Sequence, residues 1–505
     1  MLPMKLAIIV LMGATLIDGS GRAPLRNSVV VVEGDKIVAV GSRGRVRVPS
    51  NARVIDARGL VLAPGFIDAH NHSDRGFKED PSAASQVSQG ITTVVIGQDG
   101  GSPLPVGTYL SALDDNPIAL NVLTFVGHAS VRSQVMGNDT NRLATPAEIE
   151  RMKQLVAQAM RDGAMGLSTG LEYETGKPAS IEEIIGLARV AASFNGIYIS
   201  HIRDEADKTF EALQEAIRIG REAHVPVQIS HIKLGSVAVW GRAPEAVALI
   251  NRARAGGQDV TADCYPYEAW SSTIRVLIPS GKHFDPVDVA RGLADVGGPA
   301  NVTIVSCRAH PDYEFKNMEE ISKREGISAV DLYMKIVRDG GAGVIGHTMK
   351  ERDIEVFYRQ PWVMVSSDGG IGSRHPRGAG TYPRVLGRYV RELGWLKLPE
   401  AIRKMTSLPA QRFNLRDRGM VRPGFKADLV LFDPLRIIDR STFQEPQLIS
   451  EGVQRVFVNG QEVWTDGKVT GARPGRALRH KPRTSTRLSR GRETRPRYNQ
   501  SLAHP

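Results

Sequence analysis

An apolar run ends in two histidines separated by one residue in Pro64-Gly65-Phe66-Ile67-Asp68-Ala69-His70-Asn71-His72. Side chains alternate along a β-strand, so residues i and i+2 face the same way. If the strand extends through the run, His70 and His72 direct two imidazoles toward one point, as the ligands of a metal ion do. The pair alone is weak evidence, because a polar strand end gives the same pattern.

Other strand-like segments also end in a residue that can bind a metal. In a (β/α)8 barrel of the TIM type, the carboxyl ends of all strands meet at one face, where active sites lie. We therefore expect six side chains to gather at the mouth of such a barrel: His70, His72, Asp99, His201, His231 and Asp368.

The helices that a barrel requires have recognisable start and stop signals. Thr145-Pro146-Ala147-Glu148 has a Thr cap, a Pro in the first position and a Glu that completes a capping box, and the apolar stripe that follows ends near Gly163. Ser180-Ile181-Glu182-Glu183 repeats the cap, and Asn195-Gly196 is typical of a left-handed helix end. The strands predicted at 197–200 and 225–230 then end at the two later histidines.

The two ends of the chain differ from the middle in their predicted secondary structure. Residues 1–61 and 412–478 are β-rich, and we expect them to form one small β-sandwich beside a barrel formed by 62–411. Within the barrel, about 272–345 is long for one connection and predicts a lid or insert over the strand ends. The remainder, 479–505, is rich in Arg, Ser, Thr and Pro and is predicted to be disordered.

Length and composition narrow the function class. With 505 residues, the chain is too long for one simple core. The formal charge is +11, but ten Lys or Arg and one acid follow from Arg473 onward, which leaves about +2 for the rest. The basicity therefore belongs to the tail, which is expected to be a solvated extension, and we expect no nucleic-acid partner. Two cysteines exclude a disulfide framework and fit a reducing cytoplasm.

The apolar segment 6–12 has two interpretations, a signal peptide or a first β-strand. The chain continues directly into Val29-Val30-Val31-Val32 and then 36–41, with turn signals at Asp18-Gly19 and Gly34-Asp35, so we favour a β-meander. No apolar run approaches the ~20 residues of a transmembrane helix, so no membrane partner is expected. The sequence carries no signal of oligomeric state.

Four imidazoles with one or two carboxylates suit one or two divalent metal ions, with Zn²⁺ first among them. Such a metal activates water and polarises a carbonyl, while a nearby carboxylate such as Asp368 can accept a proton and return it to a leaving nitrogen. The chemistry that this set predicts is hydrolysis of an amide or a similar C–N bond. Histidines such as His128 and His347 are read as structural, and Cys264 as a small core residue.

From about residue 4 to 479 the chain resembles the D-aminoacylases (N-acyl-D-amino-acid deacylases) of the amidohydrolase superfamily. Several motifs carry the resemblance together: 64–72, Gly90-Ile91-Thr92-Thr93-Val94-Val95, 163–171, His201-Ile202-Arg203-Asp204-Glu205, Ser230-His231-Ile232-Lys233, Asp263-Cys264-Tyr265-Pro266-Tyr267, Ser367-Asp368-Gly369, His375-Pro376-Arg377 and 380–384. The resemblance implies a small-molecule substrate, an N-acyl-D-amino acid, whose amide bond is cleaved to a carboxylate and a free D-amino acid.

The resemblance also implies roles for single residues. His201 and His231 hold a tightly bound Zn²⁺, and His70 and His72 with Asp368 form a second, weaker metal position. Asp368 is implied to be the catalytic general acid/base. The residues that match the family's substrate contacts are Lys233, Tyr265, Ser271 and Arg377. Among these, Arg377 is the expected clamp for the substrate's α-carboxylate, because its planar fork pairs with a carboxylate in two places.

The chain departs from the family at one position. Where the family places a cysteine thiolate that bridges the metals, this chain has Asp99 in Gly97-Gln98-Asp99-Gly100-Gly101. A carboxylate can bridge two metals, but it is a harder ligand than a thiolate, so metal identity and metal count stay open.

Two alternatives compete with the deacylase interpretation. A cyclic-amide hydrolase of the dihydroorotase or hydantoinase kind shares the His-x-His strand, but such enzymes use a carbamylated lysine as the bridge, and no lysine stands in the matching place. A non-catalytic barrel that has lost its chemistry is expected to have lost ligands, whereas here only the bridge is changed, and to another competent ligand.

Overall fold

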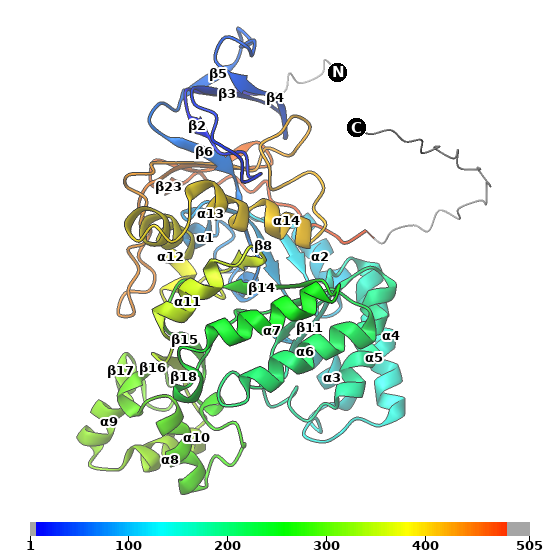
Figure 1. Cartoon of the computed structure of the whole chain (residues 1–505), viewed down its shortest axis with the longest axis vertical. Helices are drawn as coiled ribbons and strands as arrows, with labels where there is room; N and C mark the ends of the chain where they lie inside the picture. Colours follow the sequence, from blue (N-terminus) through cyan, green and yellow to red (C-terminus); the bar gives the residue numbers. More distant parts are fainter. Residues whose placement is uncertain (1–6, 482–505) are drawn as a thin grey trace, which may run out of the picture.

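A ring of parallel strands surrounded by helices forms the centre of the protein (Figure 1). The computed structural model describes residues 7–481. The ring is formed by β7 (Phe66–Asp68), β8 (Ile91–Ile96), β9 (Asn121–Thr124), β10 (Val126–Gly127), β11 (Gly166–Gly170), β12 (Ile197–His201), β13 (Val227–Ile229), β14 (Val260–Cys264) and β19 (Val363–Val365). Neighbours in this order pair in parallel, and only Phe125 separates β9 from β10, so these two form one barrel strand.

Backbone hydrogen bonds join the first strand to the last and close the ring. Asp368 N donates to His70 O (2.9 Å), and His72 N donates to Gly369 O (2.7 Å). The predicted (β/α)8 barrel is therefore confirmed. The strands are buried on both faces. This explains why their sequences are mostly apolar throughout and do not alternate between apolar and polar residues.

The helix signals of the sequence correspond to real helix ends. Thr145 and Glu148 form a complete capping box at the start of α4 (Pro146–Asp162), which ends at Gly163 in a left-handed conformation. Ser180 caps α5 (Ile181–Ser193) by accepting a hydrogen bond from Glu183 N (3.1 Å). The other helices around the barrel are α1 (Ala84–Val87), α2 (Val106–Asp115), α3 (His128–Met136), α6 (Thr209–Ala223), α7 (Ala243–Ala255), α11 (Glu351–Tyr358), α12 (Arg377–Arg384), α13 (Leu398–Met405) and α14 (Ser407–Arg412).

Both ends of the chain contribute to a second unit of two β-sheets. One sheet has the order β4 (Lys36–Ser42), β3 (Ser28–Glu33), β1 (Ile8–Met12), β5 (Arg53–Asp56). The other has the order β2 (Thr15–Leu16), β6 (Val61–Pro64), β20 (Leu429–Phe432), β21 (Val453–Val458), β22 (Gln461–Thr465), β23 (Lys468–Val469). Because β20 pairs with β6, the late segment completes a sheet begun by the early one. The first apolar segment is a strand, as predicted, from Ile8 onward.

An insert separates β14 from β19. Its antiparallel sheet has the order β15 (Trp270–Thr273), β18 (Gly343–Gly346), β16 (Val302–Ser306), β17 (Lys316–Asn317). Helices α8 (Pro286–Asp295), α9 (Met318–Glu325) and α10 (Ala329–Arg338) pack with it. Figure 1 shows the β-sandwich at one end of the molecule and this insert at the other. The domain limits 61, 411 and 478 stay predictions.

The last described segment lies against the barrel. Gly475 N donates to Ile118 O (2.9 Å), Leu478 N to Val122 O (2.8 Å) and His480 N to Gly163 O (2.9 Å). Arg479 and His480, which were predicted to begin the tail, are thus in contact with the barrel, and residues 482–505 lie outside the described residues. Between residues 7 and 481, no helix combines the length and apolar character that crossing a membrane requires.

A buried polar network connects the β-sandwich to the barrel. Asp428, just before β20, pairs with Arg418 and accepts hydrogen bonds from Asn121 Nδ2 (3.2 Å) and Asn459 N (2.7 Å). Asn121 belongs to β9, so the network crosses from one unit to the other. All four side chains are buried, and each depends on the others to satisfy its polar atoms.

We predict that Asp428→Ala destabilises the protein by about 3–5 kcal/mol, because it leaves the Arg418 guanidinium buried without its partner. Urea unfolding followed by circular dichroism measures the change. Glu451→Ala, which breaks the exposed pair with Arg440, is the control and should leave the midpoint nearly unchanged. Equal stability of the two variants would contradict the importance of the network.

Candidate metal centre

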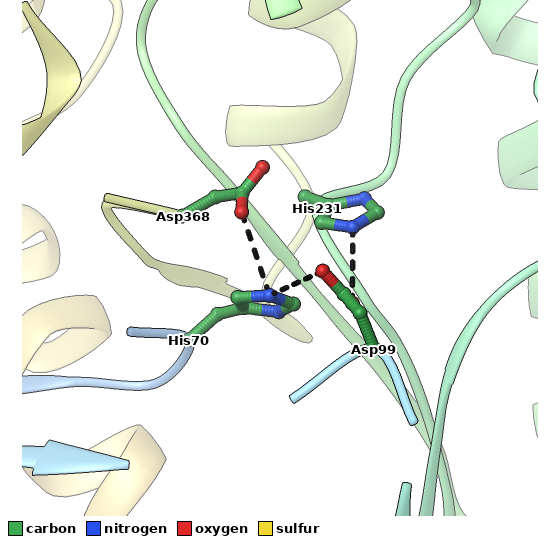
Figure 2. Close-up of side chains that lie close together, drawn as sticks. All are labelled: His70, Asp99, His231 and Asp368. Carbon is green, nitrogen blue, oxygen red and sulfur yellow. Dashed lines mark ion pairs between the residues drawn. The ribbon is translucent and has the colours of Figure 1, made fainter. Parts of the chain in front are cut away.

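The six predicted side chains lie at the carboxyl ends of the barrel strands. His70 and His72 follow β7, Asp99 follows β8, His201 is the last residue of β12, His231 follows β13, and Asp368 follows β19. Figure 2 shows four of them, His70, Asp99, His231 and Asp368, pointing toward one another. The fold thus brings together residues that are up to 298 positions apart in the chain.

Asp99 lies between the histidines of different strands. Its Oδ2 is 3.4 Å from His70 Nε2 and 3.3 Å from His72 Nε2, and its Oδ1 is 3.3 Å from His231 Nε2. Although burial opposes it, the charges of His70 and His231 hold the pKa of Asp99 well below its usual range. One carboxylate therefore faces candidate ligands on both sides.

Asp368 contacts the same two histidine nitrogens as Asp99 does. Its Oδ1 is 3.5 Å from His70 Nε2 and 3.3 Å from His72 Nε2, while its Oδ2 is 2.7 Å from Arg377 Nη1. Burial alone raises the pKa of this carboxyl, but Arg377 and then His231 hold it below the usual range. The group is therefore a carboxylate at neutral pH.

His201 and His231 face each other. His201 Nδ1 lies 3.0 Å from His231 Nε2, with ring centroids 4.7 Å apart. Two nitrogens bound to one tetrahedral zinc at about 2.0–2.1 Å lie roughly 3.3 Å from each other. The separation is thus close to that of two ligands of a shared ion.

The strand that carries the first pair is shorter than predicted. β7 ends at Asp68, and the chain bends before His70 because Asp68 accepts hydrogen bonds from His70 N (3.4 Å) and Asn71 Nδ2 (2.7 Å). The prediction that strand alternation runs through to His72 was therefore wrong. The two rings are nevertheless neighbours, with centroids 5.2 Å apart.

The donor atoms fit a divalent metal. The ligand atoms of His70, Asp99, His231 and Asp368 all lie within 4.8 Å of one another, and so do those of His201, Glu205 and His231. Among the described residues, both ring nitrogens of His70 and Oδ1 of Asp99 are buried without a hydrogen-bond partner. Buried polar atoms without a hydrogen bond are costly. A cation bound to Asp99 Oδ1 and to the His70 nitrogen that carries no hydrogen removes that cost for these two atoms.

The electrostatic field at the site favours positive charge. Burial lowers the pKa of His72, but hydrogen bonds to Asp368 and Asp99 prevail and raise it to about 9. Burial and Lys233 lower the pKa of His231, but Asp368, Glu205 and Asp99 prevail and raise it to about 10. The carboxylates therefore hold positive charge here, whether it is a proton or a metal ion.

The amidohydrolase family profile matches residues 53–464. This chain belongs to the amidohydrolase family. The chain is 37% identical over 499 residues to a D-aminoacylase of Alcaligenes xylosoxydans xylosoxydans, covering 93% of this chain and 97% of that protein. It is 39% identical to an N-acyl-D-aspartate deacylase of the same organism, covering 93% and 94% of the two chains. The family predicted from the motifs is confirmed.

A solved structure also matches over nearly the full length. An N-acyl-D-glutamate deacylase from Bordetella bronchiseptica, complexed with zinc and a phosphonate inhibitor that mimics the reaction's tetrahedral intermediate, has a TM-score of 0.84 and 36% identity. The match covers 94% of this chain and all of that chain. It supports the predicted barrel with a second domain.

In this amidohydrolase, a cavity of about 630 Å³ opens beside the candidate ligands. Lys233, Ser271 and Arg377, three of the predicted substrate contacts, line it. Tyr265 is not among the lining residues, although it was predicted to contact substrate. Its ring lies under the Arg377 guanidinium, 4.8 Å from ring centroid to carbon, so it supports that side chain from behind.

Two acids that the sequence interpretation missed also line the cavity. Glu172 Oε2 is 2.8 Å from His201 Nε2, and Glu205 contacts both Lys233 Nζ (2.6 Å) and His231 Nδ1 (3.2 Å). Both follow a barrel strand by a few residues, Glu172 after β11 and Glu205 after β12. That position was the available signal, and Glu205 also belongs to the motif His201-Ile202-Arg203-Asp204-Glu205.

Residues interpreted as structural lie outside the cluster. His128 Nε2 contacts Glu183 Oε1 (2.8 Å), which also pairs with Arg132, and His347 lies near Thr303 in the insert. Cys264 is buried on β14, and burial raises the pKa of its thiol. The cluster accordingly consists of nitrogen and oxygen donors, with no thiolate among the described residues that form it.

We predict that His201→Ala lowers the metal content of the purified protein and abolishes its hydrolytic activity, because the ring supplies one of the facing nitrogens. Elemental analysis after dialysis measures the metal. His347→Ala, at a strand end outside the cluster, is the matched control and should keep both properties. Undiminished metal content in the His201 variant would show that the ion lies elsewhere.

Proposed function

We propose that the protein hydrolyses the amide bond of N-acyl-D-amino acids and releases a carboxylate and a free D-amino acid. One observation carries the proposal: four histidines and two aspartates gather at the barrel mouth beside a cavity that holds a buried arginine. The similarity to three deacylases of this kind, each over more than nine-tenths of the chain, supports the substrate class.

The proposed metal ligands are His70, His72, Asp99, His201, His231 and Asp368, with Zn²⁺ as the expected ion. A divalent metal held there polarises the amide carbonyl and lowers the pKa of water, which is the chemistry that the site needs from it. The remaining tasks fall to the protein: to bind the substrate's carboxylate, to orient the amide and to move a proton.

Asp368 is the proposed proton carrier. It is ionised, it adjoins the histidines, and its second oxygen points to Arg377. In this role it takes a proton from the attacking water through its carboxylate and returns it to the nitrogen of the departing amine.

Arg377 is the proposed clamp for the substrate's α-carboxylate. Its side chain is buried at the cavity wall, rests on Tyr265, and also donates to Ser271 O (3.3 Å). A carboxylate that binds this guanidinium competes with Asp368 for it. Substrate binding therefore weakens the ion pair that keeps the pKa of Asp368 low, and makes Asp368 a better proton acceptor when substrate is present.

Asp99 is the proposed shared ligand of two metal positions. Its two oxygens face His70 and His72 on one side and His231 on the other, all at 3.3–3.4 Å. As a hard oxygen donor it accommodates Mn²⁺ and Co²⁺ as well as Zn²⁺. We therefore expect a weaker preference for zinc than a thiolate at this position imposes.

The alternatives have less support. A hydantoinase-like bridge needs a lysine between the histidine pairs, whereas Lys233 is bound to both oxygens of Glu205 and Asp99 occupies the central place. A barrel without catalytic function has no need of buried ligand atoms that lack a hydrogen bond, as those of His70 and Asp99 do here. We further propose a cytoplasmic location, supported by two buried cysteines without a disulfide.

A panel of N-acetyl-D- and N-acetyl-L-amino acids tests the proposed activity. We predict amide hydrolysis, followed as release of the free amino group, for D substrates and little or none for their L counterparts. Arg377→Lys should raise KM more than it lowers kcat, because one point charge replaces a planar two-point contact. Faster hydrolysis of the L series, or hydrolysis of neither, would refute the substrate class.

Replacing the central carboxylate tests the shared position. We predict that Asp99→Asn lowers the number of metal ions retained per chain, because a neutral amide cannot hold two cations together. Elemental analysis after gel filtration gives the ratio. Asp295→Asn, which alters an acid of the cavity wall outside the cluster, should leave it unchanged. A full metal complement in the Asp99 variant would exclude a shared ligand here.

A further inference from the structure

Two carboxylates outside the proposed ligand set contact the facing histidines. Glu172 and Glu205 are about nine-tenths buried, with side chains 9% and 11% exposed. Glu172 Oε2 lies 2.8 Å from His201 Nε2, and Glu205 Oε1 lies 3.2 Å from His231 Nδ1. The proton transfers proposed for Asp368 use neither acid.

In each of the two histidines, one ring nitrogen faces a glutamate and the other faces the second histidine. The atoms that face each other are His201 Nδ1 and His231 Nε2. A neutral imidazole binds a metal through the nitrogen that carries no hydrogen, and its hydrogen then lies on the other nitrogen. For both rings to bind one ion, the hydrogens have to lie on His201 Nε2 and His231 Nδ1, the atoms that face the two glutamates.

We propose that Glu172 and Glu205 are positioning residues for a metal held by His201 and His231. Each accepts the ring N–H of one histidine, which fixes the tautomer and the ring orientation and makes the ligating nitrogen more basic. This proposal rests on the metal-dependent function proposed above, and it adds two residues to the site that neither the motifs nor the ligand set assigned.

Lys233 explains why Glu205 is needed. Its Nζ lies 2.7 Å from Oε1 and 2.6 Å from Oε2 of Glu205, and also 2.6 Å from His231 Nδ1. If Lys233 donated to Nδ1, the ring hydrogen would lie on Nε2 and would block the metal-facing atom. In the proposed metal-bound state Lys233 donates to Glu205 instead of to Nδ1. The Nδ1 hydrogen can then point to Glu205 Oε1, 3.2 Å away, and Nε2 is left to bind the metal.

Glu172 also contacts the loop that carries Glu205. Glu205 N donates to Glu172 Oε1 (3.4 Å), so the loop after β11 and the loop after β12 are joined beside the histidines. Glu172 thus uses one oxygen for the ring of His201 and the other for the neighbouring loop. Its carboxylate has two partners in fixed directions, as an orienting group requires.

Replacement of Glu172 gives the sharper test, because within residues 7–481 its carboxylate forms no ion pair with a lysine or arginine. The probe is Zn²⁺ alone, and its affinity for the full chain is measured by competition with a chromogenic chelator. Glu172→Met removes the acceptor at similar length, and we expect affinity to fall about 10–100-fold. Glu172→Gln keeps one acceptor oxygen, so its affinity for Zn²⁺ should lie between those of the parent and of Glu172→Met. Glu174→Met, in the same loop with a side chain 70% exposed, is the matched control and should bind like the parent.

Glu205→Gln provides the second variant, and we expect its affinity for Zn²⁺ to fall as well. Because Lys233 loses a charged partner in it, thermal unfolding of the metal-free protein is measured alongside. An affinity loss with an unchanged unfolding midpoint supports positioning, as does recovery of kcat at saturating Zn²⁺.

Three results would overturn the proposal. Affinities of Glu172→Met and Glu205→Gln within about twofold of the parent would show that the acids do not orient the ligands. Affinity losses that merely follow a lower metal-free unfolding midpoint would assign them a structural role. A raised KM with unchanged Zn²⁺ affinity would make Glu172 a substrate contact. The parent serves as the reference for the function itself: a parent that binds no Zn²⁺ contradicts the metal-dependent function, whichever way the variants behave.

Discussion

The closure of the barrel between its first and last strands is the constraint on which the site depends. Asp68 accepts hydrogen bonds from Ser367 N (2.8 Å) and Asn71 Nδ2 (2.7 Å), and Asp368 N donates to His70 O (2.9 Å). Burial raises the pKa of the Asp68 carboxyl, and the hydrogen bonds from Ser367 and Asn71 oppose that effect. Asp68, which stands in the same motif as His70 and His72, thus holds two candidate ligands, His70 and Asp368, against each other.

The charges around the barrel mouth then determine which ions the site can bind. Asp99 and Asp368 face the histidines from two sides, and the fixed cations Arg377 and Lys233 are each already paired with an acid. The uncompensated negative charge is what makes His72 and His231 so basic, with pKa values of about 9 and 10. The same charge makes a divalent cation a better occupant than protons, because it neutralises several carboxylates at once and leaves each ring neutral.

The sequence predicted features that depend on local rules. The cap at Thr145 and the strand ends at His201 and His231 follow from short patterns, and the structure has them where they were expected. Two features that local patterns do not determine depend on contacts between distant segments. The strand before His70 is shortened by Asp68, which is bound to Ser367, and Tyr265 lies behind Arg377 rather than in the cavity. Glu172 and Glu205 could have been selected by their position after a barrel strand. The roles proposed for them could not, since each depends on a histidine on another loop or on a lysine nearly thirty residues away.

Backbone conformation gives a further indication that the barrel mouth is arranged to bind a metal ion. Asp99, His231 and Asp368 have positive φ angles of 54°, 32° and 46°, a region that residues other than glycine rarely occupy. Each such residue costs of order 1–3 kcal/mol and persists only where the surrounding structure enforces it. All three stand just after barrel strands, where the chain has to turn back so that its side chain reaches the centre. Three proposed ligands, on three separate strands, share this conformation, which Asp and His adopt more readily than most residues. It fits a site whose donor atoms are held in place before the metal arrives, so that binding requires little rearrangement of the protein.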